Sequence, residues 1–152
     1  MKIIKKIALL LCLLSPLSQA ETTLFGLTLG KSTRQEAEQT YTLQNERARP
    51  GLPNRSYYNV SGNQFKEPQL EVATLYFDDT QTLEGILFTF PPSVQKYKEL
   101  KDQLSRQYPL LKMEPFVSDP LRIIDKVEFR NDTTHVSLTY DYHGIFLGFT
   151  NL

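Results

Sequence analysis

In the middle of the chain, apolar residues gather in two short stretches. Residues 70–77 (LEVATLYF) and 83–90 (LEGILFTF) are rich in β-branched and aromatic side chains and are separated by the polar residues DDTQT. Two such runs joined by a short polar segment predict an antiparallel β-hairpin. Because both alternating faces of each run carry apolar residues, we expect two central strands, with something packed over each side for at least part of their length.

After this hairpin the apolar residues recur every three or four positions. Ser93 is a natural helix N-cap and Pro109 is a helix stop. Between them runs one apolar stripe, formed by Val94, Tyr97, Leu100, Leu104 and Tyr108. The spacing predicts a long amphipathic helix that lies across the sheet.

The region before the hairpin predicts a strand and a shorter helix. Residues 24–29 (LFGLTL) form an apolar run that is closed by a glycine. Ser-Thr at 32–33, followed three residues later by Gln-Glu at 35–36, is typical of a capping box. We therefore expect a short strand and then a helix that ends near Tyr41.

Three further strands are predicted in the last third of the chain. They lie at 125–131 (DKVEFRN), at 134–142 (THVSLTYDY) and after Gly144 (IFLGFTNL). A meander of three antiparallel strands is the simplest arrangement. The predicted fold class is α+β: an antiparallel β-sheet with a short N-terminal helix and one long amphipathic helix packed on one face.

The first twenty residues have the order of a secretory signal peptide. Three lysines precede an apolar run from Ile7 to Leu14, and a Ser-Pro break and small residues follow it. This run is much shorter than the ~20 residues that span a bilayer. The pattern predicts a signal peptide at 1–20, cleaved after Ala20. Cys12 follows a leucine within the apolar run, so we interpret it as part of the signal helix rather than as a lipidation site.

Composition narrows the possible environments of the mature chain. Residues 21–152 have the length of a single domain and contain no cysteine, hence no disulfide and no thiolate. Without the signal lysines, 14 basic residues stand against 17 acidic ones. A weakly acidic chain has no general attraction for nucleic acid or for anionic lipid. These features predict an exported bacterial protein, periplasmic rather than extracellular, with no nucleic-acid partner and no membrane span.

A polar segment at 42–68 contains the first group of candidate binding residues. It is punctuated by prolines and glycines, and it either holds an extra strand at SYYNV or forms a long functional loop. Arginine and tyrosine are over-represented at interface hot spots. The protein-binding candidates here are Arg47, Arg49, Arg55, Tyr57 and Tyr58.

The second group lies in HVSLTYDYH, which carries both histidines of the chain. On a strand, His135, Ser137, Thr139 and Asp141 share one face, and His135 and Asp141 are about 20 Å apart at about 3.3 Å per residue. A catalytic triad needs contacts within hydrogen-bond reach, and a metal site needs three or four ligands. We therefore predict no catalytic, metal or cofactor site. Instead, His135 and Asp141 are candidates for a polar contact surface, and His143 is expected in the following turn.

Several stretches resemble small, uncharacterised periplasmic proteins of Gram-negative bacteria. The resemblance is carried by LFGLTLGKSTRQEAEQ, by LYFDDTQTLEGILFTF with YKELKDQLSRQYPL, and by PFVSD with the final strands. The sheet-and-helix order is distantly similar to that of outer-membrane-assembly lipoproteins and β-lactamase-inhibitor-like domains. The resemblance implies an α+β fold and an envelope location.

The functional hypothesis is a non-catalytic protein that acts through contacts with another envelope or secreted protein, as an inhibitor, an immunity factor or an accessory factor. Two alternatives remain open. One is a hydrolase or metal-dependent enzyme whose site is assembled from distant residues, for example His135 and Asp141. The other is a carrier that holds a small ligand on an aromatic sheet face.

Overall fold

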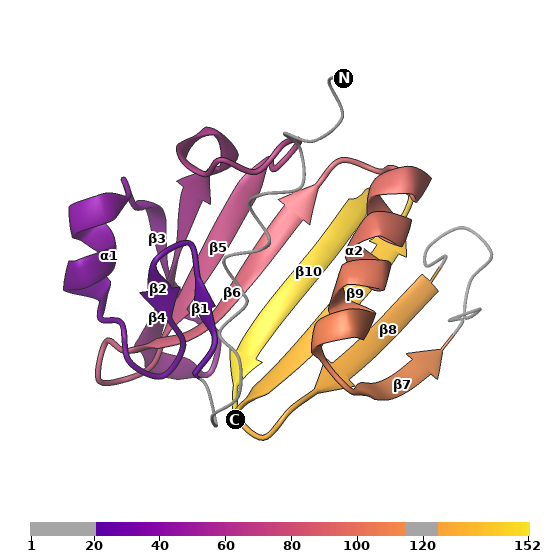
Figure 1. The fold of residues 1–152 in the computed structure, drawn as a ribbon. Coiled ribbons are helices and arrows are strands. Elements are labelled where there is room, and N and C mark those ends of the chain that lie inside the picture. Colours follow the sequence, from indigo (N-terminus) through magenta and orange to yellow (C-terminus); the bar gives the residue numbers. More distant parts are fainter. Residues whose placement is uncertain (1–20, 115–124) are drawn as a thin grey trace.

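The structure is a computed structural model that describes residues 21–114 and 125–152 (Figure 1). The predicted signal peptide and the whole of the PFVSD stretch lie outside the described residues.

An eight-stranded antiparallel sheet forms the body of the molecule, so the predicted α+β class with an antiparallel sheet is found (Figure 1). The C-terminal strand lies in the middle of the sheet and joins the first hairpins to the last ones. The order of the strands across the sheet is β3 (Gln44–Arg49), β4 (Leu52–Ser61), β5 (Val72–Phe77), β6 (Leu83–Phe90), β10 (Gly144–Asn151), β9 (Thr134–Asp141), β8 (Asp125–Arg130) and β7 (Leu110–Glu114).

The predicted central hairpin is β5–β6, and the predicted meander is β8–β9–β10. The polar segment at 42–68 contains two strands: SYYNV belongs to β4, which pairs with β3 on one side and β5 on the other. β7 was not predicted from the sequence. The single strand expected at 24–29 is wrong: two short strands, β1 (Thr23–Leu24) and β2 (Leu27–Thr28), form a tight hairpin. The Phe25-Gly26 pair between them has positive φ at both positions, as a two-residue primed turn requires.

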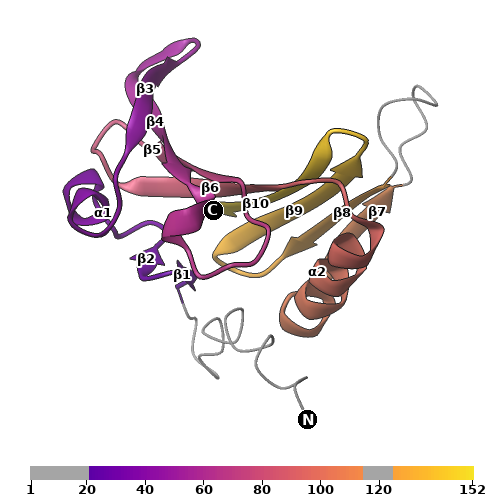
Figure 2. The same ribbon diagram turned by 90° about the horizontal axis from the view of Figure 1, so that it is seen from above.

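Both predicted helices begin at the expected caps. α1 (Arg34–Thr40) has a capping box between Thr33 and Glu36, and α2 (Val94–Gln107) is capped by the Ser93 side chain. α2 lies across β8, β9 and β10, and β1–β2 lies on the same side of the sheet (Figures 1 and 2). α1 lies beside the start of β6, where a backbone bridge joins Thr33 to Thr82.

One face of the sheet is buried in the hydrophobic core. Neighbouring strands place their apolar residues in continuous rows, because the register keeps side chains of the same face opposite one another. One fully buried row across five strands is formed by Leu75, Ile86, Phe149, Val136 and Phe129. α2 closes this face with Tyr97, Leu100 and Leu104.

The opposite face, called the open face below, carries the intervening residues. Its middle row is formed by Asn59, Thr74, Leu87, Gly148, Ser137 and Glu128. The side chains of β5, β8 and β9 alternate between buried and partly exposed positions. Among the described residues no helix covers this face, and the β3–β4 hairpin curls up beside it (Figure 2). We expected elements packed over both faces of β5 and β6. The described elements pack over one face only.

No helix within residues 21–114 or 125–152 is both long and apolar enough to cross a membrane.

Candidate functional site

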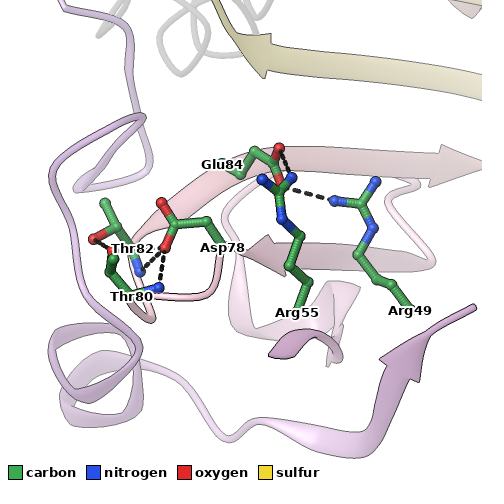
Figure 3. A network of polar contacts seen from close by, with 6 residues as sticks. All are labelled: Arg49, Arg55, Asp78, Thr80, Thr82 and Glu84. Atoms are coloured by element: carbon green, nitrogen blue, oxygen red, sulfur yellow. Dashed lines mark hydrogen bonds and ion pairs between the residues drawn. The ribbon is translucent and has the colours of Figure 1, made fainter. Parts of the chain in front are cut away.

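Three arginines of the β3–β4 hairpin lie on the open face. Cross-strand pairing aligns Arg47 with Tyr57 and Tyr57 with Tyr76. Arg49 and Arg55 converge on one carboxylate: their Nη1 atoms lie 2.7 and 2.6 Å from the two oxygens of Glu84 (Figure 3). The side chains of Arg49, Arg55 and Glu84 are 31, 34 and 26 % exposed, so water still screens the two ion pairs.

Two tyrosines complete this group. The rings of Tyr57 and Tyr76 have their centroids 5.6 Å apart, and the guanidinium of Arg49 lies 5.4 Å from the Tyr76 ring centroid. Burial raises the pKa of Tyr76 above its usual value, Tyr57 adds to this effect, and Arg49 opposes it. Tyr76 therefore stays protonated at neutral pH and keeps its hydroxyl as a donor. We call Arg47, Arg49, Arg55, Tyr57, Tyr76 and Glu84 the arginine–tyrosine cluster.

The neighbouring turn between β5 and β6 is held by Asp78. Its Oδ1 atom accepts from the backbone N–H groups of Thr80 and Thr82 at 2.8 and 3.0 Å and from the Thr80 hydroxyl at 2.7 Å (Figure 3). Burial alone would raise the pKa of Asp78, but these hydrogen bonds and the charge of Arg55 lower it. This carboxylate thus supports the turn that leads into the strand of Glu84.

A hollow of about 230 Å³ lies between the arginine–tyrosine cluster and β9. Arg49, Tyr76 and Glu84 line one end, and Ser137 and Thr150 line the other. Gly85 and Gly148, which sit inside the central strands β6 and β10, contribute to the lining and have no side chains to fill it. Glycine inside a strand often marks a place where another group approaches the backbone.

The structure separates Tyr58 from the other candidates of the hairpin. This residue is 5 % exposed and lies on the buried face. Its hydroxyl donates to Glu46 Oε1 at 2.7 Å and accepts from Arg34 Nη1 at 3.1 Å. Tyr58 thus joins the hairpin to α1 instead of extending the open face.

His135 and Asp141 lie at opposite ends of β9. His135 pairs with Thr150, and its Nε2 atom is 3.9 Å from Glu128 Oε2. The Oδ1 atom of Asp141 accepts from the backbone N–H groups of His143 and Gly144, at 2.7 and 3.1 Å. His143 follows the strand in the turn, as predicted. Within residues 21–114 and 125–152, no group of three or more His, Cys, Asp or Glu residues could hold a metal ion.

Three residues that shape this face were missed in the sequence. Glu84 is the one charged residue in the run LEGILFTF, and Gly85 and Gly148 interrupt runs of strand-forming residues. A charge or a glycine inside a predicted central strand is a usable signal, because both are unfavourable there without a specific role. The sequence alone did not predict the pairing of β6 with β10, which brings the two glycines to adjacent strands.

Comparison of the chain with protein-family models, with curated proteins and with solved structures finds no match.

Proposed function

We propose that this protein is an exported, non-catalytic protein of the bacterial periplasm that binds another envelope or secreted protein through the open face of its sheet. The observation that carries this proposal is the arginine–tyrosine cluster, in which Glu84 pairs with Arg49 and Arg55 and the Tyr57 and Tyr76 rings are in contact, on a face that no described helix covers. Because α2 and the β1–β2 hairpin lie on the opposite side of the sheet (Figure 2), the open face is available for contact.

The chemistry of the cluster suits an acidic partner surface. Arg49 and Arg55 share the single carboxylate of Glu84, and Arg47 is exposed without a hydrogen bond or ion pair to another described residue. Planar guanidinium groups bind carboxylates with paired hydrogen bonds. Tyrosine rings add apolar contact area at a low cost in side-chain entropy. An acidic patch on the partner would therefore find both charge complementarity and an aromatic platform here.

Site-specific photo-crosslinking in living cells tests the proposal. A benzophenone amino acid replaces Tyr57 on the open face or, as the matched control, exposed Lys98 on α2. We expect a discrete crosslinked protein from position 57 and none from position 98. Equal crosslinking from both positions, or none from position 57, would contradict binding through the open face.

A charge reversal then tests the electrostatic part of the proposal. In the chain that carries the crosslinker at position 57, Arg47→Glu is expected to reduce the adduct several-fold, since it places a like charge opposite the acidic partner. Lys98→Glu makes the same charge change on α2 and is expected to leave the adduct unchanged. An adduct that responds equally to both reversals would point to net charge instead of a defined face.

A further inference from the structure

Two glycines in central strands, Gly85 and Gly148, border the hollow beside the arginine–tyrosine cluster. A Cβ atom built on Gly148 would lie 2.9 Å from the Ser137 hydroxyl oxygen and 3.7 Å from a Leu87 methyl carbon, within the space of the hollow. Glycine inside a strand weakens it, because it packs no side chain and loses more entropy on folding. The protein thus keeps glycine at a central strand position that borders the hollow, where any side chain would take up part of the space.

The lining of the hollow is rich in hydrogen-bond donors. Arg49, Tyr76, Ser137 and Thr150 each contribute an N–H or O–H group. The one carboxylate there, that of Glu84, already accepts from Arg49 and Arg55 through its two oxygens. A group that enters the hollow therefore meets donors whose natural complement is an acceptor with negative charge.

The size of the hollow limits what can enter. About 230 Å³ is below the ~300–1,000 Å³ of pockets that enclose a small organic ligand. It suits one side chain that projects from a larger partner. This size favours a protein contact over a carried ligand.

We propose that the hollow receives the carboxylate of an aspartate or glutamate side chain from an acidic segment of the partner protein. The carboxylate binds the guanidinium of Arg49 and accepts from the hydroxyl groups of Ser137 or Thr150. This assignment rests on the proposed function and deepens it: the arginine–tyrosine cluster attracts an acidic surface, and the hollow anchors one residue of it.

NMR titration of the ¹⁵N-labelled chain 21–152 with a deca-glutamate peptide at low salt tests the assignment. Ser137→Leu fills the hollow from β9 and leaves the arginines and Glu84 untouched. Thr139→Leu is the matched control, since it enlarges a side chain two residues along the same strand and face, outside the hollow. We expect chemical-shift changes centred on Gly85 and Gly148 and binding about tenfold weaker in Ser137→Leu, on the scale of one lost charge-assisted hydrogen bond. Thr139→Leu should bind as the original chain does.

A second variant shows whether weaker binding comes from the filled hollow or from a defect in folding. Gly148→Ala places a single methyl group in the hollow, and the Ser137 hydroxyl can rotate away from it. Its binding should be a few-fold weaker at an unchanged melting temperature. Inorganic phosphate at matched ionic strength is the competitor: displacement of the peptide by phosphate but not by chloride would overturn the carboxylate assignment in favour of a phosphate site.

The outcomes separate this inference from the function on which it rests. If both filling variants bind deca-glutamate like the original chain while Arg49→Gln and Arg55→Gln lose it, the hollow is not the anchor and the acidic-partner proposal stands. If the original chain shows no shifts on the open face, or binds deca-lysine equally well, both proposals are overturned.

Discussion

Leu138 and Thr139 are neighbours on β9, yet they belong to different parts of the molecule. Leu138 has no exposed surface and lies in a buried row between Leu147 and Val127. Thr139 points to the open face, between Phe146 and Lys126. The same alternation holds along β5, β8 and β9, where the residues on one face are apolar and packed and those on the other face are polar or mixed. The apolar packing that stabilises the fold is therefore concentrated on one face, and the other face can carry polar and charged side chains.

The largest expected effect on stability comes from a pair of side-chain truncations on β9, which compares the two faces directly. Leu138→Ala should reduce the free energy of unfolding by about 2–5 kcal/mol, because it leaves a cavity in the core. Thr139→Ala should change it by no more than about 0.5 kcal/mol, as is usual at a surface position. Urea unfolding followed by circular dichroism measures both. Similar losses for the two variants would show that the open face is covered in solution.

Loss of the Tyr97 hydroxyl has the next largest expected effect. Tyr97 donates to Asp125 Oδ2 at 2.6 Å, and its ring stacks on Tyr140 beneath α2. Tyr97→Phe should cost about 1.5 kcal/mol near pH 7, the lower end for a hydrogen bond to a charged group, because Asp125 remains partly exposed and keeps Lys101. Tyr142→Phe, at a half-exposed position, should leave stability unchanged.

The same variant has a pH signature. Burial raises the pKa of Tyr97 strongly, and the hydrogen bond to Asp125 and its charge add to the rise. A tyrosine whose pKa is higher in the folded chain than in the unfolded chain makes its full contribution to stability below the unfolded pKa of about 10. This contribution is lost as the pH increases above that value. The original chain should therefore lose stability above about pH 10 more steeply than Tyr97→Phe. Parallel pH profiles of the two proteins would contradict a buried, neutral Tyr97.

The smallest effects are expected for the two polar residues at the ends of β9. Asp141→Ala removes an acceptor from two backbone N–H groups of the β9–β10 turn and should cost about 1 kcal/mol. His135→Ala removes a partly exposed imidazole and should change stability by less than about 0.5 kcal/mol. Asp141→Asn, which keeps an acceptor oxygen, should recover most of the loss. Thermal unfolding of the three variants decides whether Asp141 acts through the turn.

Much of the fold could be predicted because its signals are local. The capping residues Thr33 and Ser93 begin the helices, and the apolar runs of β5 and β6 form the expected hairpin. β7 escaped prediction because Leu110 and Leu111 follow the helix stop without a clear alternation. The turn at Phe25-Gly26 escaped it because a phenylalanine with positive φ is unusual and has no local signal.

The candidate site was predictable in part. The sequence by itself determined which side chains of β9 share a face, because a strand has a period of two, and it selected the arginines and Tyr57 of the hairpin by composition. It could not place Tyr58 in the core beside Glu46 and Arg34, since that depends on how α1 meets the hairpin.

Only the tertiary structure decided that Arg49 and Arg55 meet at Glu84 and that Gly85 and Gly148 lie on adjacent strands. The physical reason is that β10, the last strand in the sequence, pairs with β6 in the middle of the sheet. A pairing over such a sequence separation depends on the whole core, and no local pattern specifies it.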